Sequence, residues 1–203
     1  MAGSVGWGQV LADRFRLIEP FAEDPLLEVW LAEDLELGRE VVVKLLLPRW
    51  MHDEQMVERF RFEALAAASV VHANVARTFD VEHADGRLFS ISEYVPGPTV
   101  AQLMGEAPRP ASEVAAIGLQ AARALATMHA QGLVHAAICP QNLIVGPTGR
   151  LCIIDFGSVR PFDVADHLPD PVFPEPGVRD DCPLSASRGP HRTSAATSTA
   201  WAW

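Results

Sequence analysis

The chain has 203 residues, 49% of them hydrophobic, and a formal net charge of -10. This composition predicts a globular protein with a packed core, and the acidic balance without a dense Lys/Arg cluster excludes nucleic acid as a partner. The three cysteines show no CxxC spacing, which excludes a disulfide framework or a zinc site. No apolar run of about 18 residues and no signal peptide is present, so we expect a cytoplasmic protein without a membrane segment.

The N-terminal segment divides into a leader and three strands. Residues 1–13 are Gly-rich and polar and predict a disordered leader, with Trp7 as its only large side chain. From Arg14 onward, apolar alternation and the Leu37-Gly38 turn signal predict three antiparallel strands. Their sequences are RFRLIEPF, EVWLAEDL and REVVVKLLL.

A helix is predicted next, over residues 53–69, with Asp53 as its N-cap. Its expected apolar face comprises Met56, Phe60, Leu65 and Ala68. Two further strands should follow around the hairpin signal Asp85-Gly86, and Pro96-Gly97-Pro98 ends the second of them. We expect a boundary between two lobes at this point.

A second helix is predicted over residues 111–131, with Ser112 as a possible cap and Gly132 at its C-terminal end. The stretch HAAICPQNLIVGPTGRLCIIDFG then runs from His135 to Gly157. It predicts two short strands that bring Asn142 and Asp155 to neighbouring strand ends, where an amide oxygen and a carboxylate could bind a hard cation such as Mg²⁺.

That stretch resembles the catalytic segment of protein kinases, which reads His-Arg-Asp-Leu-Lys-Pro-Glu-Asn and is followed at the same spacing by Asp-Phe-Gly. The chain is similar to the bacterial (Hanks-type) Ser/Thr kinases. The resemblance implies an α+β fold of two lobes, a β-rich N-lobe with one long helix and a partial helical C-lobe. It places the N-lobe at residues 14–98 and the partial C-lobe at 99–161.

The residues that the family uses for chemistry are replaced. Ala137 stands at the position of the family's catalytic Asp, Ala136 at the Arg and Cys139 at the Lys. No catalytic residue is therefore intact, and the chain looks like a pseudokinase. His135 is implied to pack against Asp-Phe-Gly.

The phosphate-binding hairpin is altered as well. The family's Gly-x-Gly-x-x-Gly glycines correspond to Ala22, Asp24 and Leu27, with Pro25 between them. Side chains at these positions block close approach of the backbone, and the Asp24 charge should repel phosphate oxygens. We expect binding of ATP and Mg²⁺, which the family implies, to be weak or absent.

Other nucleotide-site positions are retained in part. Lys44 matches the family's phosphate-binding lysine, and Glu63 is expected to form an ion pair with it. Asn142 and Asp155 remain as the implied metal ligands. Ser92 falls at the gatekeeper and should leave a back pocket open beside Lys44. The remaining implied nucleotide-binding residues are Val29, Val42, Glu93, Val95 and Ile144.

The C-terminal segment, residues 162–203, is Pro-rich and then Ser/Thr/Ala-rich, which predicts disorder. A codon string encoding the kinase-like sequence DERSDVYSLGV encodes TSAATSTAWAW, the whole of Thr193 to Trp203, when it is read one base further on. We therefore expect a frameshift, natural or from sequencing, that begins between Pro171 and Asp180 and truncates the kinase-like domain.

Three functions remain open. The first is a binding or regulatory module that acts through protein partners and transfers no phosphoryl group, because the general base is absent at Ala137. The second is an active, atypical Ser/Thr kinase that uses Lys44, Asn142 and Asp155 with a replacement base. The third is a truncated fragment without a function.

Overall fold

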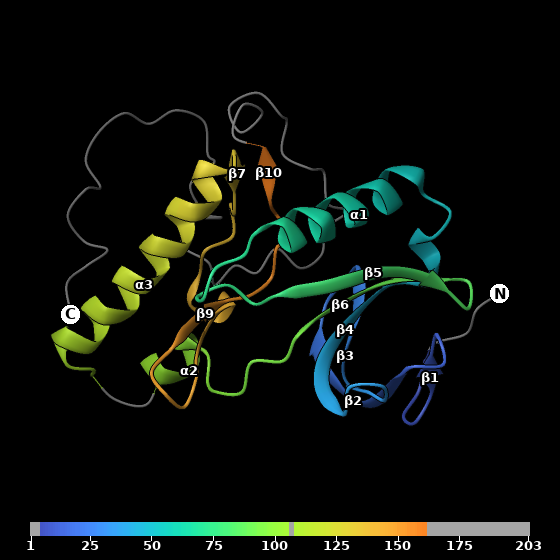
Figure 1. Cartoon of the computed structure of the whole chain (residues 1–203), viewed down its shortest axis with the longest axis horizontal. Coiled ribbons are helices and arrows are strands. Elements are labelled where there is room, and N and C mark those ends of the chain that lie inside the picture. Colours follow the sequence, from blue (N-terminus) through green and yellow to red (C-terminus); the bar gives the residue numbers. More distant parts are fainter. Residues whose placement is uncertain (1–4, 106–107, 162–203) are drawn as a thin grey trace.

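The computed structural model describes residues 5–105 and 108–161. Within them, a curved six-stranded antiparallel sheet with one long helix beside it forms the first lobe (Figure 1). A short helix, a long helix and two small two-stranded sheets form the described part of the second lobe. The chain passes between the lobes after the last strand of the large sheet, and Pro96-Gly97-Pro98 lies in this connection.

The large sheet has the strand order β1-β2-β3-β4-β6-β5. Its longer strands match the predicted segments, and their inward side chains form one core that includes Phe15, Leu17, Val43 and Phe89. The bounds are β1 Val10–Leu11, β2 Phe15–Glu23, β3 Leu27–Asp34, β4 Arg39–Leu46, β5 Thr78–Ala84 and β6 Arg87–Glu93.

The prediction of a disordered leader is wrong for residues 5–13. Val5 and Leu11 are buried in the sheet core, and β1 pairs with β2. The burial of these two aliphatic side chains stabilises the segment, a contribution that its Gly-rich composition concealed. Trp7 is 82% exposed, so the one large side chain of the segment does not hold it in place. Residues 1–4 lie outside the described part of the chain.

Helix α1 spans Glu54–Ser69, as predicted, after a short 3-10 turn η1 at Pro48–Trp50. The Asp53 carboxylate accepts hydrogen bonds from the amides of Gln55 and Met56, which confirms it as the N-cap. The predicted apolar face is partly wrong, because Leu65 is 62% exposed and Ala68 is exposed as well. The residues that α1 buries are Phe60, Ala64, Ala66 and Ala67.

The second lobe is built around helix α3, Ala111–Ala130, which follows the short helix α2 at Val100–Met104. Pro110 is the N-cap of α3 and no side chain caps it, so the Ser112 prediction is wrong. Gly132 lies just past the helix with a φ of 72°, the left-handed conformation expected of a terminating glycine. The remaining elements are β7 Leu133–Val134, η2 Pro140–Asn142, β8 Leu143–Val145, β9 Leu151–Ile153 and β10 Arg160–Pro161.

One asparagine connects the two lobes. Asn74 Nδ2 donates to the Leu151 carbonyl at 2.7 Å and to Gln120 Oε1 on α3 at 2.8 Å. The backbone of residues 74–76 adds hydrogen bonds to Ile153 in β9. These contacts fix β9, and with it Asp155, relative to the large sheet.

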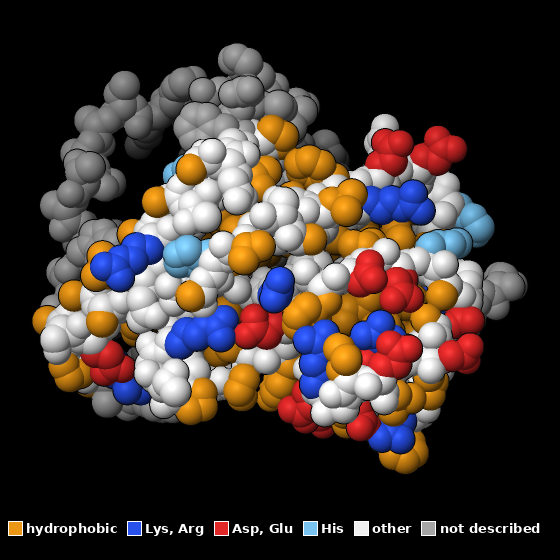
Figure 2. Space-filling view, in the orientation of Figure 1, with side chains coloured by type: hydrophobic (Ala, Val, Ile, Leu, Met, Phe, Trp, Pro, Cys, Tyr) orange, Lys and Arg blue, Asp and Glu red, His pale blue; other side chains and the backbone are white. Residues whose placement is uncertain are grey.

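Hydrophobic side chains are scattered over the surface of both lobes (Figure 2). They include Phe62 and Leu65 on α1 and Val114 and Leu119 on α3. No helix of the described residues is long and apolar enough to cross a membrane.

Candidate functional site

A pocket with a volume of about 460 Å³ lies between the large sheet, α1 and the segment around β8 and β9. Its size falls within the usual range for small-molecule sites. The structure brings all ten of the predicted nucleotide- and metal-binding side chains to this one pocket, although they come from segments far apart in the sequence. They are Val29, Val42, Lys44, Glu63, Ser92, Glu93, Val95, Asn142, Ile144 and Asp155.

Lys44 and Asp155 form an ion pair in the pocket. Lys44 extends from β4, and its Nζ lies 3.0 Å from Asp155 Oδ1. Asp155 has a φ of 65°, in the left-handed region that non-glycine residues rarely adopt. The Gly157 amide donates to the same Oδ1 at 3.4 Å. The Asp-Phe-Gly segment therefore turns its carboxylate back toward the lysine.

The expected ion pair between Lys44 and Glu63 is not formed in this structure. Glu63 Oε1 instead accepts from Arg59 Nε at 2.6 Å, one helical turn earlier on α1. Arg59 Nη2 also donates to the Gly157 carbonyl at 2.9 Å, so this arginine links α1 to the Asp-Phe-Gly segment. Burial raises the pKa of Glu63 to about 7, and the Arg59 guanidinium opposes the rise.

Two hydrogen bonds hold the segment from His135 to Asn142. Asn142 is buried, and its Nδ2 donates to the Ala137 carbonyl at 2.9 Å. The Ala137 amide donates to His135 Nδ1 at 3.3 Å. Both hydrogen bonds involve the Ala137 backbone, so they fix the backbone at this position. The side chain there is only a methyl group.

The predicted packing role of His135 is confirmed. Its ring is almost fully buried and lies 5.1 Å from the ring of Phe156, centroid to centroid. Burial lowers the pKa of His135 to about 4, so it is neutral at physiological pH. Cys139, at the position of the family's lysine, is buried.

The hairpin between β2 and β3 ends in a tight turn that an acidic side chain closes. Asp24 Oδ1 accepts hydrogen bonds from the amides of Leu26 at 2.8 Å and Leu27 at 3.1 Å. Pro25, between Asp24 and Leu26, has no N–H to donate. The side chains of Asp24 and Leu27 both line the pocket, where the family has glycines.

The segment that joins the lobes also lines the pocket. The Glu93 carboxylate pairs with Arg150 and accepts from the Arg77 amide, which holds the end of β6. Val95 is buried in the pocket wall, and among the described residues no hydrogen-bond partner exists for its N–H or its C=O.

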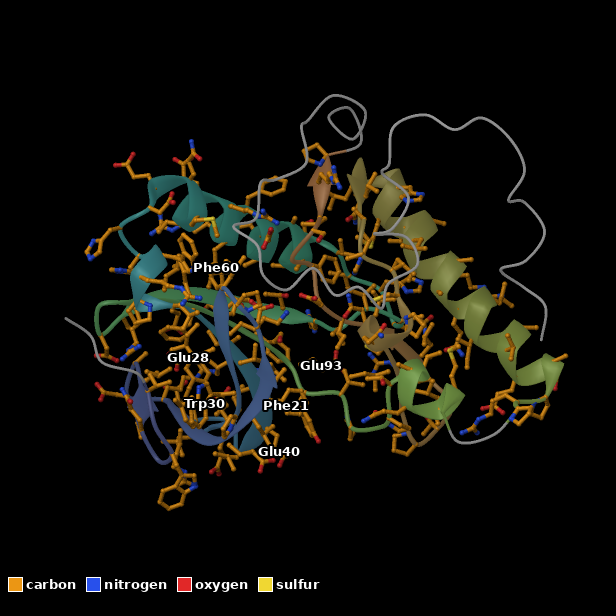
Figure 3. All side chains as sticks on the ribbon, turned by 180° about the vertical axis from the view of Figure 1, so that it is seen from behind. Phe21, Glu28, Trp30, Glu40, Phe60 and Glu93 are labelled. Atoms are coloured by element: carbon orange, nitrogen blue, oxygen red, sulfur yellow. The ribbon has the colours of Figure 1, made fainter. Side chains whose placement is uncertain are left out.

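Among the residues whose side-chain contacts at the site were not predicted from the sequence, three form specific interactions. Phe21 and Tyr94 pack edge to face with ring centroids 5.7 Å apart and both line the pocket. Figure 3 shows Phe21 and Glu93 on the side of the sheet that faces the second lobe. Arg59 is the third. Its spacing of four residues from Glu63 was a readable signal for a helical ion pair.

The two implied metal ligands, Asn142 and Asp155, both line the pocket. Asn142 supplies an amide and Asp155 a carboxylate, and the Ile154 amide donates to the Asn142 backbone carbonyl at 2.9 Å. Hard oxygen donors of this kind suit Mg²⁺, which takes its other ligands from water and phosphate oxygens. No cluster of three or more His, Cys, Asp or Glu ligands occurs in the part of the chain that the structure describes.

A β-rich lobe with a single helix, joined to a helical lobe across a pocket that holds Lys44, Asn142 and Asp155, defines the protein kinase fold. A family profile for the protein kinase domain matches residues 28–172, more than half of the chain. The chain belongs to the protein kinase domain family.

Its relatives are bacterial Ser/Thr kinases. The chain is 35% identical to the serine/threonine-protein kinase PknA of Mycobacterium tuberculosis over 164 residues, which are 78% of this chain and 38% of PknA. It is 33% identical to the probable serine/threonine-protein kinase CPE1738 of Clostridium perfringens over 157 residues, 77% of this chain and 23% of that protein.

Solved structures agree with the fold. The crystal structure of the Mycobacterium tuberculosis PknI kinase domain superposes with a TM-score of 0.64 at 27% identity. The match covers 76% of this chain and 63% of that kinase domain. The chain thus spans well under half the length of these curated relatives and about three fifths of one solved kinase domain.

Proposed function

We propose that this chain is a pseudokinase, a kinase-fold binding and regulatory module that transfers no phosphoryl group. The observation that carries the proposal is Ala137. Its backbone is held by His135 and Asn142 in the arrangement described above, and its side chain has no group that can accept a proton. General-base loss costs a factor on the order of 10² to 10⁴ in rate.

The pocket supports the same conclusion. The Lys44 ammonium is paired with Asp155, and Glu63 is paired with Arg59, so the usual lysine–glutamate pair that orients the lysine on ATP phosphates is absent from the described contacts. Binding of Mg²⁺-ATP should therefore be weak. With no group transfer, the role rests on binding, and proteins are the partner class that we propose.

Phosphoryl transfer from radiolabelled ATP tests this proposal. The chain should label neither itself nor a set of protein substrates above the level of the Asp155→Ala variant, which removes an implied metal ligand. Labelling that Asp155→Ala abolishes would show an active kinase instead. Ala137→Asp is the matched gain-of-function variant, and it should not restore full activity because the glycine hairpin is also missing.

An active, atypical Ser/Thr kinase is the second candidate. The presence of Lys44, Asn142 and Asp155 in one pocket favours it. This candidate needs a replacement base, and Asp24 is a carboxylate that lines the pocket. Its Oδ1, however, already accepts hydrogen bonds from the Leu26 and Leu27 amides. A fragment without a function is the third candidate, and a stable, soluble product detected in cells would exclude it.

The frameshift is also a proposal, because residues 162–203 lie outside the described part of the chain. The family match supports it, since it stops at residue 172, within the interval from Pro171 to Asp180 where the change of frame is expected. Resequencing the gene across the codons for residues 162–203 tests it. A corrected base should continue the kinase match, and an unchanged sequence would refute the frameshift.

The cytoplasmic location is likewise proposed. Cys152 is a buried free thiol, which agrees with a reducing compartment. Detection of the chain in a cell fraction would test this directly.

A further inference from the structure

We propose that a second pocket binds an acidic side chain of a partner protein, together with an aliphatic side chain next to it. This pocket has a volume of about 230 Å³, and its lining comes from the segment between α1 and β5, the end of β6 and the β8–β9 turn. It shares only Glu93 with the pocket described above. The proposal deepens the proposed function and rests on it, because it gives the regulatory module a defined site for a protein partner.

The segment between α1 and β5 is held against the second lobe, so the pocket is formed before any partner arrives. The segment runs beside β9 in Figure 1, and the Ala76 amide donates to the Ile153 carbonyl at 2.8 Å. Val70 and Val75 line the pocket, and both are buried in the core. Binding to a preformed pocket costs less conformational entropy than binding to one that must first be ordered.

Arg77 gives the pocket a positive charge that has no described partner. Its side chain is exposed, lines the pocket and forms no hydrogen bond or ion pair with the side chains and backbone that the structure describes. Only its backbone amide is engaged, and it donates to Glu93 Oε2 at 3.1 Å. Glu93 Oε1 is paired with Arg150 at 3.2 Å. The pocket therefore has two guanidinium groups and one carboxylate, which leaves one positive charge for a ligand.

The site has donors besides Arg77. His72 Nδ1 accepts from the Asn74 amide at 3.0 Å, so the proton of the neutral ring lies on Nε2, which can donate. Arg150 Nε donates to the Ala73 carbonyl, and this bond fixes a second guanidinium in the pocket wall. A carboxylate that reaches Arg77 can accept two parallel hydrogen bonds from its guanidinium, which is the strongest geometry for such a pair.

The size and the rim of the pocket favour a protein side chain over a free metabolite. Pockets for whole small molecules usually have volumes of about 300 to 1,000 Å³, and this pocket is smaller. Val71, one of its lining residues, is 69% exposed. An aliphatic side chain that packs on Val71 gains free energy because apolar surface leaves water, whereas an inorganic anion gains nothing there. An acidic residue flanked by Leu, Ile or Val therefore fits both the charge and the apolar surface.

Titration of the ¹⁵N-labelled full chain, followed by NMR, tests the proposal with four probes. They are acetyl-Leu-Glu-Leu-amide, acetyl-Leu-Gln-Leu-amide, acetyl-Gly-Glu-Gly-amide and inorganic phosphate. The Arg77 Nε–H signal and the backbone amide signals of Val71 and His72 report binding. Acetyl-Leu-Glu-Leu-amide should bind roughly fivefold or more tightly than its Gln counterpart, the upper end for an exposed ion pair. Its affinity should fall as salt is added, whereas that of the Gln peptide should not.

Variants separate the charge from the apolar contact. Arg77→Gln keeps the backbone amide and should remove the preference for Glu over Gln, whereas Arg77→Lys should retain part of it. Val71→Ser should weaken acetyl-Leu-Glu-Leu-amide to the level of acetyl-Gly-Glu-Gly-amide and leave the preference for Glu over Gln unchanged. Arg123→Gln removes an exposed arginine of α3 that lines neither pocket, and this matched control should change nothing.

Four outcomes would overturn the proposal. They are equal affinity for the Glu and Gln peptides, a preference for Glu that survives in Arg77→Gln, the absence of binding by any peptide, and phosphate binding as tight as that of acetyl-Leu-Glu-Leu-amide, which would show a site for free anions. In each case the pseudokinase proposal would stand, since it rests on the lack of phosphoryl transfer. Transfer from ATP that depends on Asp155 would defeat the pseudokinase proposal and leave a measured peptide preference in place.

Discussion

Glu63 gives a sharp test of the electrostatics of the pocket. Its side chain is 17% exposed, and its pKa is raised from 4.5 to about 7, chiefly by burial. An acid whose pKa is raised on folding binds its proton more tightly in the folded state. Its contribution is therefore most favourable at low pH and is lost as the pH rises from about 4.5 through about 7.

The size of the effect follows from the two pKa values. Between pH 5 and pH 8 the unfolded chain is already deprotonated at this position, while the folded chain releases its proton near pH 7. The shift then costs the folded state about 2 to 3 kcal/mol over this interval. Glu63→Gln has no titrating proton, so the wild type should lose that amount relative to the variant.

Urea unfolding at pH 5 and pH 8 measures the difference between the two proteins. His135 opposes the trend, because its lowered pKa of about 4 removes stability as the pH falls below about 6.5, but it does so in both proteins. The comparison of wild type with Glu63→Gln therefore isolates Glu63. Equal changes in the free energy of unfolding for both proteins would refute the argument and show that Glu63 stays ionised across this range.

Two further predictions concern stability and use the same urea assay. Gly97→Ala should lower the free energy of unfolding by about 2 kcal/mol or more, because Gly97 has a φ of 141° and an added Cβ would lie 2.3 Å from the Val145 carbonyl oxygen. Gly118→Ala is the control. Gly118 lies within α3 with open space around its Cβ position, so this variant should not be destabilised. Asp53→Ala should cost about 1 kcal/mol through loss of the α1 N-cap; an unchanged midpoint would mean that the cap contributes nothing in this context, and Asp53→Asn should keep most of the stability.

The longer elements could be predicted from the sequence because local signals coincide with the tertiary structure. Strong apolar alternation defines β2 to β4, and the Asp85-Gly86 hairpin has both residues in the left-handed conformation that the dipeptide favours. The prediction of a disordered leader was wrong because the burial of Val5 and Leu11 stabilises a strand of only two residues. So short a strand shows no periodicity in the sequence. The prediction that Leu65 is buried was wrong because the apolar residues of α1 cover a broad face, and only part of that face packs against the rest of the protein.

The site was predictable in its membership and less so in its pairing. Motif spacing predicted that Lys44, Asn142 and Asp155 lie in one pocket, and they do, since each lies at a fixed place in its strand or turn. Ion pairs depend on which rotamers reach each other, and Arg59 lies closer to Glu63 along the helix than Lys44 does across the pocket. A spacing of four residues favours such a pair in any isolated helix. Arg59 could therefore be recognised in the sequence as a competing partner for Glu63, but only the structure shows that Glu63 pairs with Arg59 and not with Lys44.

The two departures from an active kinase have different structural consequences. At Ala137 the fold uses only the backbone, through the hydrogen bonds to His135 and from Asn142, so the loss of the carboxylate leaves the loop intact. In the hairpin, the Asp24 side chain itself supplies the bonds that shape the tip. Replacing Ala137 with Asp would therefore restore a functional group without disturbing the scaffold. Restoring the phosphate-binding hairpin would require rebuilding the turn, so under the pseudokinase proposal the hairpin is the firmer barrier to ATP-dependent chemistry.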